Sequence, residues 1–375
     1  MRVMTIVGTR PEIIKLSRVI AELDARTQHT LVHTGQNFDY ELNQIFFDDL
    51  EIRKPDHFLN AAAPSAAATI ANVIKAADEL FEREHPEALL LLGDTNSCLA
   101  AVPAKRRHIP IFHMEAGNRC FDMRVPEEIN RRIVDHVSDI NLTYTEHARR
   151  YLLAEGIRPE TVIKTGSPMR EVLNYYKDKI EASDVLARLG LEADGYFVVS
   201  AHREENVDYD ERLDRLVAAL KKMEAQYRKP VIMSVHPRTA QRLDARSQTL
   251  AVGGADIRFL KPLGFLDYVR LQRSAFCVLS DSGTLTEESS ILDFPAVMLR
   301  DAHERPEGMD VGTLVMTSLD VDRIMQGIDL VRAHRRTDSR SFAPVPDYEV
   351  DDVSRKVARI VLSYRDYVMR TVWKA

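Results

Sequence analysis

Short apolar runs alternate with amphipathic segments along the whole chain. The runs have strand length and are almost continuously apolar, and the segments between them repeat their apolar residues at helical spacing. This β-α-β-α order without paired hairpins predicts parallel sheets covered by helices on both faces. In the first half of the chain the predicted strands are Met4–Val7, His29–Thr34, Ala88–Leu92, Pro110–Met114, Ile140–Thr143 and Val162–Lys164.

The same pattern restarts in the second half of the chain. A polar stretch separates the two series, and we predict a linker at 169–194 between domains at 1–168 and 195–350. The helical pattern at 351–375 is expected to pack back on the first domain. Two doubly wound domains in tandem are expected to turn the C-terminal ends of their strands toward one cleft. The strands predicted in the second domain are Tyr196–Ser200, Val231–Val235, Ile257–Leu260, Phe276–Leu279, Ala296–Leu299 and Thr313–Met316.

Length and composition agree with this picture and limit the function. The chain has 375 residues and a mass of 42.7 kDa, enough for two domains, with 45% hydrophobic and 29% charged residues. A net charge of −6 and a pI near 6.1 argue against nucleic acid or an anionic membrane as partner. Three widely spaced cysteines, and the absence of a signal peptide or a membrane-spanning run, predict a cytoplasmic protein.

Acidic residues follow three elements of the first domain. Asp94 comes directly after one predicted strand and Glu115 after the next, while Glu127 and Glu128 open a predicted helix. Clustered carboxylates in a cleft raise one another's pKa, which suits an acid or base that works near neutrality. Helix capping at Asp94 and a favourable first-turn position for Glu127 are the structural alternatives.

Groups suited to anion binding follow the strands of both domains. Arg10 and Lys15 place cations at the start of the first helix, and His202 and His236 each follow a strand of the second domain. The segment Ser280–Thr284 ends a strand and opens a helix, so its hydroxyls and backbone N–H groups suit a diphosphate, although an ordinary helix cap has the same composition. Glu288, one turn further on, suits a ribose diol.

Several chemistries lack their motif in this sequence. No G-x-G-x-x-G follows a strand, and no G-x-x-x-x-G-K-[ST] is present, which argues against a dinucleotide or a P-loop nucleotide. No spacing of histidine, cysteine and acidic residues suggests a metal site. We therefore expect neither a cofactor nor a metal. The expected substrate is a nucleotide diphosphate whose attached group reacts with the carboxylates.

Taken together in their order, these segments resemble the non-hydrolysing UDP-N-acetylglucosamine 2-epimerase family. Each motif alone is weak, but the ordered set covers nearly the whole chain. The matching segments are Gly8–Glu12, Gly93–Thr95, His113–Gly117, Pro126–Glu128 with Asn130-Arg131, His202–Asn206, Asp281–Gly283 with Glu287-Glu288, and Glu304–Glu307.

The resemblance implies a GT-B-type fold and a homodimer. It also implies a mechanism in which UDP and the C2 proton leave a 2-acetamido sugar to give a glycal, and UDP then adds back. By motif match, Asp94, Glu115 and Glu127 form the acid/base group, and His202 assists near the diphosphate. Tyr268 is expected near the uracil. The residues expected to bind UDP or substrate are Arg10, Lys15, His236, Ser282, Gly283, Thr284, Glu288 and Arg305.

Differences from the commonest family members bear on the substrate. The stretch between Glu115 and Glu127 is shorter than in those members, and the residues that follow Gln36 in the sequence differ. In addition, Ala302-His303 precedes Glu304. These features are similar to a capsule and O-antigen branch that converts UDP-2-acetamido-2,6-dideoxy-L-talose to UDP-N-acetyl-L-fucosamine, and we expect that substrate. UDP-N-acetylglucosamine is the alternative, giving UDP-N-acetylmannosamine. More distant alternatives are a GT-B glycosyltransferase and a non-catalytic UDP-sugar sensor.

Overall fold

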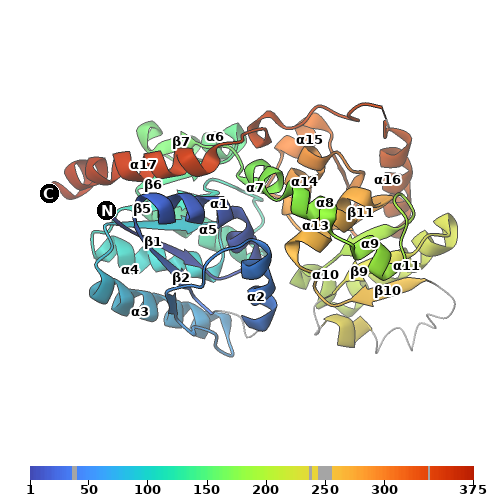
Figure 1. Ribbon diagram of the computed structural model, residues 1–375, viewed down its shortest axis with the longest axis horizontal. Helices are drawn as coiled ribbons and strands as arrows, with labels where there is room; N and C mark the ends of the chain where they lie inside the picture. Colours follow the sequence, from blue (N-terminus) through green and yellow to red (C-terminus); the bar gives the residue numbers. More distant parts are fainter. Residues whose placement is uncertain (36–39, 236–238, 244–255, 337) are drawn as a thin grey trace. The chain divides into compact units, whose positions relative to one another are not determined.

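The computed structural model describes residues 1–35, 40–235, 239–243, 256–336 and 338–375. The chain divides into two compact units, of which unit 1 contains Met1–Tyr175 with Pro346–Ala375, and unit 2 contains Tyr176–Val345. Each unit is built on one parallel sheet covered by helices (Figure 1). The predicted fold class, two Rossmann-like α/β domains, is confirmed.

Unit 1 contains a seven-stranded sheet in the order β3-β2-β1-β4-β5-β6-β7. The central strands are buried on both faces, which explains their continuous apolar sequence. From β1 the chain proceeds outward to β2 and β3 and then returns to β4 on the other side of β1. The loops after β1 and β4 therefore flank a topological switch point, where such sheets bind ligands. The strands are β1 (Arg2–Val7), β2 (Gln28–His33), β3 (His57–Phe58), β4 (Ala88–Leu92), β5 (Ile111–Met114), β6 (Ile140–Thr143) and β7 (Val162–Lys164).

The helices of unit 1 depart from the sequence pattern in two places. Neither α2 nor the edge strand β3 was predicted. For β3 the reason is its length, because two residues are too few to show a period. The segment between β4 and β5 is divided into η1 and α4, and Pro103 lies in the first turn of α4, where its missing N–H costs no hydrogen bond. The helices are α1 (Arg10–Arg26), α2 (Tyr40–Asp49), α3 (Ala66–Glu84), η1 (Asn96–Ala100), α4 (Ala101–Arg106), α5 (Pro126–Val137), α6 (Glu146–Ala154), η2 (Pro159–Thr161), α7 (Met169–Tyr175), η3 (Pro346–Tyr348), α17 (Val353–Val368) and η4 (Met369–Trp373).

Unit 2 repeats this plan with six parallel strands in the order β10-β9-β8-β11-β12-β13. Its switch point lies between β8 and β11. Both faces of the sheet carry a buried apolar cluster under the helices. The strands are β8 (Phe197–Ser200), β9 (Val231–Ser234), β10 (Ile257–Leu260), β11 (Cys277–Ser280), β12 (Ala296–Met298) and β13 (Val315–Met316). The helices are α8 (Lys177–Ala182), α9 (Val185–Leu189), α10 (Glu204–Val207), α11 (Asp210–Tyr227), α13 (Phe265–Ser274), α14 (Thr284–Leu292), α15 (Glu307–Val311) and α16 (Val321–Ala333).

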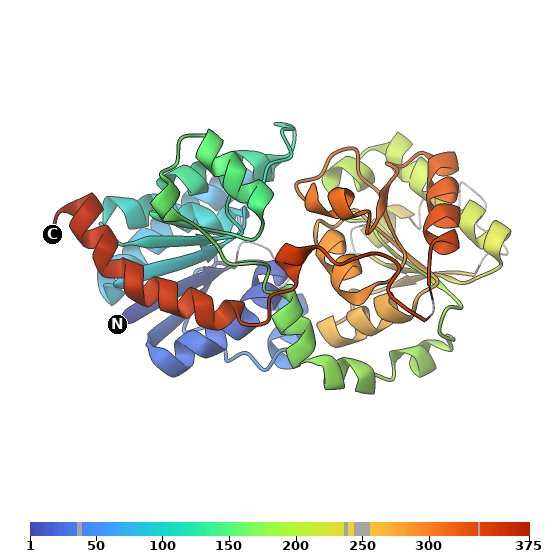
Figure 2. The same cartoon turned by 90° about the horizontal axis from the view of Figure 1, so that it is seen from above.

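The stretch 169–194, which we predicted as a linker, contains three short helices. Of these, α7 belongs to unit 1, while α8 and α9 belong to unit 2. Ile180 and Val185 anchor α8 and α9 because both side chains are buried. The final helix α17 belongs to unit 1 and packs against α1 (Figures 1 and 2).

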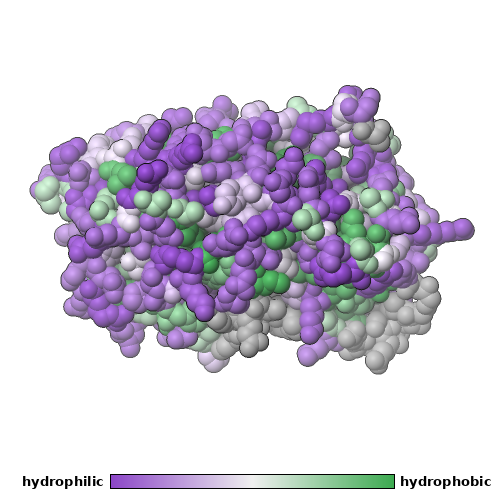
Figure 3. All heavy atoms as spheres, in the orientation of Figure 1, coloured by the Kyte–Doolittle hydropathy of each residue, from purple (hydrophilic) through white to green (hydrophobic). Residues whose placement is uncertain are grey.

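The surface reflects the high charged fraction of the sequence. The face shown in Figure 3 is mainly hydrophilic, and its hydrophobic atoms form small separate patches. Among the helices of the described ranges, none has both the length and the apolar character needed to cross a membrane.

Candidate active site

Two of the three predicted acids meet at the C-terminal edge of the unit 1 sheet. Asp94 follows β4, and Glu115 follows the neighbouring strand β5. A Cβ atom built on Gly93 would lie 3.9 Å from Glu115 Oε2, so the Glu115 carboxylate lies beside the loop that carries Asp94. Because β4 borders the switch point of the sheet, this pair occupies the position where a ligand is expected.

Each of these carboxylates has its own cationic partner. Lys15 Nζ lies 2.8 Å from Glu115 Oε2, and the lysine side chain is only 2% exposed. Arg131 Nη2 donates to Asp94 Oδ2 at 2.7 Å, while its Nη1 donates to Glu128 Oε2 at the same distance. Lys15, which the resemblance assigns to UDP, is thus part of the acid group in unit 1.

The backbone around Glu115 adopts an unusual conformation. Glu115 has φ 62°, in the left-handed region that side chains other than glycine seldom occupy. Gly117 follows with φ 82°, and a Cβ there would overlap with the Ala148 carbonyl. Strain of this kind persists where the surrounding structure enforces it, and it concentrates at functional sites. The turn therefore fixes the direction in which the Glu115 carboxylate leaves the strand.

The third predicted acid lies in the first turn of α5. Glu127 is half-buried there, whereas its neighbour Glu128 is completely buried. Glu128 accepts hydrogen bonds from the Cys120 N–H at 3.0 Å and from Arg131. Burial would raise the pKa of Glu128, but these contacts lower it below its ordinary value. Glu128 is therefore an ionised structural group that ties α5 to the preceding loop, and Glu127 is the more accessible of the two.

A fourth carboxylate, Glu12 in the first turn of α1, was not predicted as a site residue. It is 2% exposed and accepts hydrogen bonds from the N–H groups of Gly8 and Thr9 and from the hydroxyls of Thr95 and Ser97. Burial raises the pKa of Glu12 to about 7 in spite of these contacts. Glu12 links the loops on both sides of the switch point, whereas Arg10, two residues earlier, stacks 5.7 Å from the centre of the Phe46 ring.

In unit 2, His202 is paired with a buried carboxylate. His202 follows β8 and Asp281 follows the neighbouring strand β11, so both lie at the switch point of this sheet. His202 Nδ1 lies 3.1 Å from Asp281 Oδ1, and the N–H groups of His202 and Arg203 donate to the same carboxylate at 3.0 Å. Burial would raise the pKa of Asp281, but the His202 contacts and the other donors lower it to about 2. Asp281 thus holds Nδ1 as a donor, and 52% of the imidazole remains exposed.

The loop after β11 brings together four of the nine residues predicted for UDP or substrate. The hydroxyls of Ser282 and Thr284 are 3.0 Å apart at the start of α14. Gly283 between them lies against Arg305, and a Cβ at this position would overlap with the guanidinium group. Arg305 is itself held by Glu287 at 3.1 Å and by Glu304 at 2.8 Å. The loop therefore presents hydroxyls, helix N–H groups and a fixed arginine side by side.

The remaining predicted residues of unit 2 are less completely defined. Glu288 on α14 is nearly buried, and its Oε2 accepts a hydrogen bond from Gln272 Nε2 at 2.7 Å. Tyr268 is half-buried one turn before Gln272, on the same face of α13. His236 lies outside the described residues, as does Gln36.

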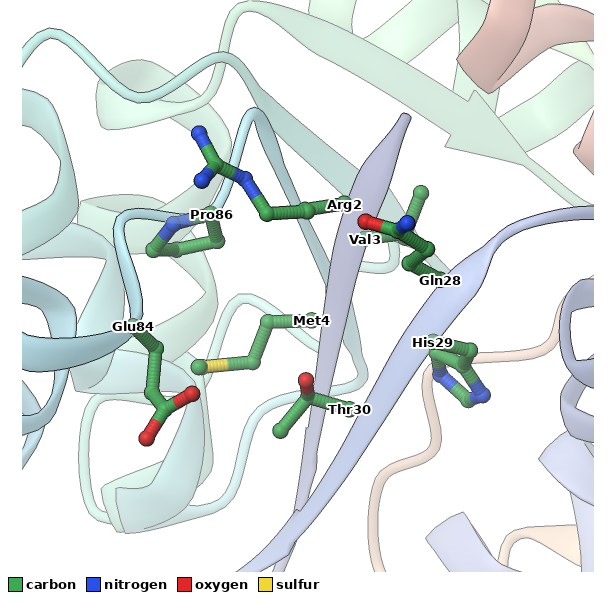
Figure 4. A pocket seen from close by; sticks show the side chains of 8 residues that line it. All are labelled: Arg2, Val3, Met4, Gln28, His29, Thr30, Glu84 and Pro86. Carbon is green, nitrogen blue, oxygen red and sulfur yellow. The ribbon is translucent and has the colours of Figure 1, made fainter.

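A separate hollow of about 260 Å³ lies at the opposite edge of the unit 1 sheet (Figure 4). It is found at the N-terminal ends of the strands β1 and β2. None of the predicted site residues lines it, so it plays no part in the site described above. Its lining residues are Arg2, Val3, Met4, Gln28, His29, Thr30, Glu84 and Pro86.

Comparison with known proteins defines the class to which this architecture belongs. The family model described as UDP-N-acetylglucosamine 2-epimerase matches residues 21–362. The UDP-N-acetylglucosamine 2-epimerase of Methanococcus maripaludis is 33% identical over 329 residues, which cover 86% of this chain and 90% of that protein. A UDP-2,3-diacetamido-2,3-dideoxy-D-glucuronate 2-epimerase of Pseudomonas aeruginosa is also 33% identical, with coverage of 87% and 91%.

Solved structures agree with this result. The UDP-N-acetylglucosamine 2-epimerase from Rickettsia bellii has a TM-score of 0.94 and 53% identity, and the match covers 100% of both chains. The Methanocaldococcus jannaschii UDP-GlcNAc 2-epimerase, solved in complex with UDP-GlcNAc and UDP, has a TM-score of 0.89 and 30% identity, with coverage of 96% and 99%. The chain belongs to the UDP-N-acetylglucosamine 2-epimerase family, whose members are isomerases of GT-B-type fold that act on UDP-sugars.

Proposed function

We propose that this enzyme inverts C2 of a UDP-2-acetamido sugar by eliminating UDP to a glycal and adding it back. The observation that carries the proposal is the acid group of unit 1, in which Asp94 and Glu115 lie together, each paired with its own cation. Such a group suits proton removal and return at one carbon. We assign Glu127, the accessible acid of α5, to the same group.

The reaction balances without any further reactant. In the forward step a carboxylate of the acid group takes the C2 proton, the C1–O bond breaks, and UDP leaves with the bonding electrons, so that C1 and C2 become doubly bonded. In the return step an acid donates a proton to the other face of C2 as the UDP oxygen bonds to C1. Two carboxylates with different surroundings are suited to these opposite roles.

The groups of unit 2 are suited to holding the departing diphosphate. Ser282, Gly283 and Thr284 open α14 with hydroxyls and N–H groups, and Arg305 supplies a fixed positive charge beside them. His202, oriented by Asp281, is suited to stabilising the negative charge that develops on the leaving oxygen. Together with Arg10, Tyr268 and Glu288, these residues are our proposal for the UDP site.

Two substrates are consistent with this mechanism, and we propose UDP-2-acetamido-2,6-dideoxy-L-talose as the physiological one. The loop after Glu115 supports this choice because Phe121 and Met123 are 64% and 58% exposed. Apolar side chains suit the methyl group of a 6-deoxy sugar better than the hydroxymethyl group of UDP-N-acetylglucosamine. The names of the relatives favour UDP-N-acetylglucosamine, which is the second candidate.

The test is to incubate the protein in D₂O with each UDP-sugar separately and to follow C2 by NMR. An epimerase incorporates deuterium at C2 and produces the second epimer, and the physiological substrate shows the higher kcat/KM. Release of UDP without deuterium at C2 would indicate a transferase or hydrolase instead. Binding of both UDP-sugars without turnover would indicate a sensor.

We also propose that the enzyme works as a homodimer, as the family resemblance implies. Light scattering during size-exclusion chromatography measures the mass directly. The expected mass is twice the 42.7 kDa of one chain. A single-chain mass at assay concentration would refute the dimer and leave the assignment of the reaction intact.

A further inference from the structure

His113 is a buried histidine of unit 1 with a hydrogen-bond acceptor at each ring nitrogen. It lies on β5, two residues before Glu115, and its side chain is completely buried. Its Nε2 lies 2.7 Å from the carbonyl oxygen of Gly93, and its Nδ1 lies 2.9 Å from Asp135 Oδ1. A carbonyl oxygen can only accept a hydrogen bond, so Nε2 must carry a proton.

The environment of Asp135 settles the state of the other nitrogen. Arg119 Nη1 donates to Asp135 Oδ2 at 2.7 Å, and the Gly117 N–H donates to both carboxylate oxygens at 3.2 Å. Burial would raise the pKa of Asp135, but the His113 and Arg119 contacts lower it below its ordinary value. Asp135 is therefore an ionised acceptor, and His113 Nδ1 also carries a proton.

His113 is thus an imidazolium whose charge faces the Asp135 carboxylate. Arg119 pairs with Glu155 as well as with Asp135, and Glu155 also lies 3.8 Å from Arg132 and 3.9 Å from His136. Burial would lower the pKa of His113, but the contact with Asp135, the Gly93 carbonyl and the nearby Asp94 charge raise it above its ordinary value. The charged groups around the ring are Asp135 and Arg119, with Asp94 on the β4 loop and Glu155 beyond Arg119.

The contacts of this imidazolium connect the two loops that carry the acid group. Gly93, whose carbonyl it binds, precedes Asp94 directly in the chain. Through Asp135 it also holds the N–H of Gly117, which closes the strained turn of Glu115. His113 is thus hydrogen-bonded toward both loops, and each loop carries a residue of the acid group.

We propose that His113 is a positively charged positioning residue for the epimerisation, holding the Asp94 loop and the Glu115 turn at their working separation. This rests on the proposed function, because the separation matters only if both acids act at one carbon. Displacement of an acid by a fraction of an ångström lowers the rate of proton transfer strongly, while the diphosphate loops of unit 2 do not depend on His113.

The kinetic test compares His113→Gln with His29→Gln, both in deuterium exchange at C2. His29 is a matched control, because its side chain is also fully buried in unit 1 and bridges Asp24 and Thr5 at the opposite edge of the sheet. We expect His113→Gln to lose about tenfold or more in kcat, with KM and the Kd for UDP within about threefold of wild type. We expect His29→Gln to keep its kcat within about twofold. A folded His113→Gln variant with wild-type kcat would overturn the proposal.

A second measurement requires no variant to fold. Neutron diffraction from wild-type crystals grown near neutral pD locates deuterons on the His113 ring. Deuterons on both Nδ1 and Nε2 support the proposal, and a bare nitrogen overturns it. If the wild-type protein fails to exchange the C2 proton, the proposed function is wrong, and the neutron result still decides the charge of His113.

Discussion

Asp94 is a residue of the acid group whose charge can be removed with little change in the shape of the side chain. Its carboxylate accepts from Arg131 at 2.7 Å, and asparagine has the same shape. We predict that Asp94→Asn lowers kcat about 100-fold or more, because the acid group loses a member that can exchange a proton. The Kd for UDP, measured by titration calorimetry, is expected to stay within about threefold, since the proposed diphosphate groups belong to unit 2.

A matched control is available in the same unit. Asp78 also accepts two hydrogen bonds from one arginine, Arg107, but it lies on α3, away from the site. Asp78→Asn is expected to retain wild-type kcat. If Asp94→Asn also turned over at the wild-type rate, Asp94 would have no part in proton transfer.

Glu12 makes the stability of the protein depend on pH near neutrality. Burial raises the pKa of Glu12 from 4.5 to about 7, so the folded state prefers the protonated acid. Its contribution to the free energy of unfolding is therefore complete below pH 4.5 and is lost as the pH rises through 7. The variant Glu12→Gln does not ionise at this position and serves as the reference. Relative to it, we predict that the free energy of unfolding of the wild-type protein falls by at most about 3 kcal/mol from the acidic to the alkaline end of this window.

Urea unfolding at a series of pH values measures this difference. Glu79→Gln serves as the control, because Glu79 is an exposed residue of α3 whose carboxylate lies 3.9 Å from Lys75. Its curve is expected to run parallel to that of the wild type. Parallel curves for wild type and Glu12→Gln would show that Glu12 titrates in the folded protein at its ordinary pKa.

At the scale of the element, α5 links the acid group to the remainder of unit 1. Arg131 on this helix donates to Asp94 from Nη2 and to Glu128 from Nη1, and a lysine has a single ammonium for both carboxylates. We predict that Arg131→Lys lowers kcat about 10-fold to 100-fold and leaves the Kd for UDP within about threefold. Arg150→Lys, an exposed position on α6, is the control and is expected to keep its kcat. Equal activity of both variants would contradict the role of α5.

The elements that could be predicted from the sequence are those whose burial produces a recognisable pattern of apolar residues. The central strands β1, β4 and β5 are buried on both faces, so their apolar runs are continuous and visible. The edge strand β3 has two residues and leaves no such pattern. Likewise, the linker at 169–194 appeared irregular because its short helices bury only a few side chains each.

For the site, the kinds of residue at the strand ends were predictable and their partners were not. Lys15 and Glu115 are separated by 100 positions in the chain, and their contact follows from the order of strands in the sheet. The same holds for His202 with Asp281, which meet because β8 and β11 are neighbours. A sequence without a known strand order does not determine such pairs, so neither the contact of Lys15 with Glu115 nor that of His202 with Asp281 was predicted.

At the scale of the whole molecule, the two units carry different groups at the same architectural position. Unit 1 has carboxylates with their cations at its switch point, and unit 2 has hydroxyls, N–H groups and Arg305 at its own. Each unit also has its own apolar core. If proton transfer belongs to unit 1 and diphosphate binding to unit 2, unit 2 expressed without unit 1 should still bind the diphosphate.

Unit 2 is continuous in the sequence, from Tyr176 to Val345, and is therefore the part to express alone. We predict that it folds, as judged by circular dichroism and cooperative unfolding, and binds UDP with a Kd within about tenfold of the full chain. Gly283→Ala in the same fragment is expected to weaken UDP binding about tenfold or more, because its Cβ overlaps with Arg305. A folded fragment that binds no UDP would mean that residues of unit 1, such as Arg10, supply most of the affinity.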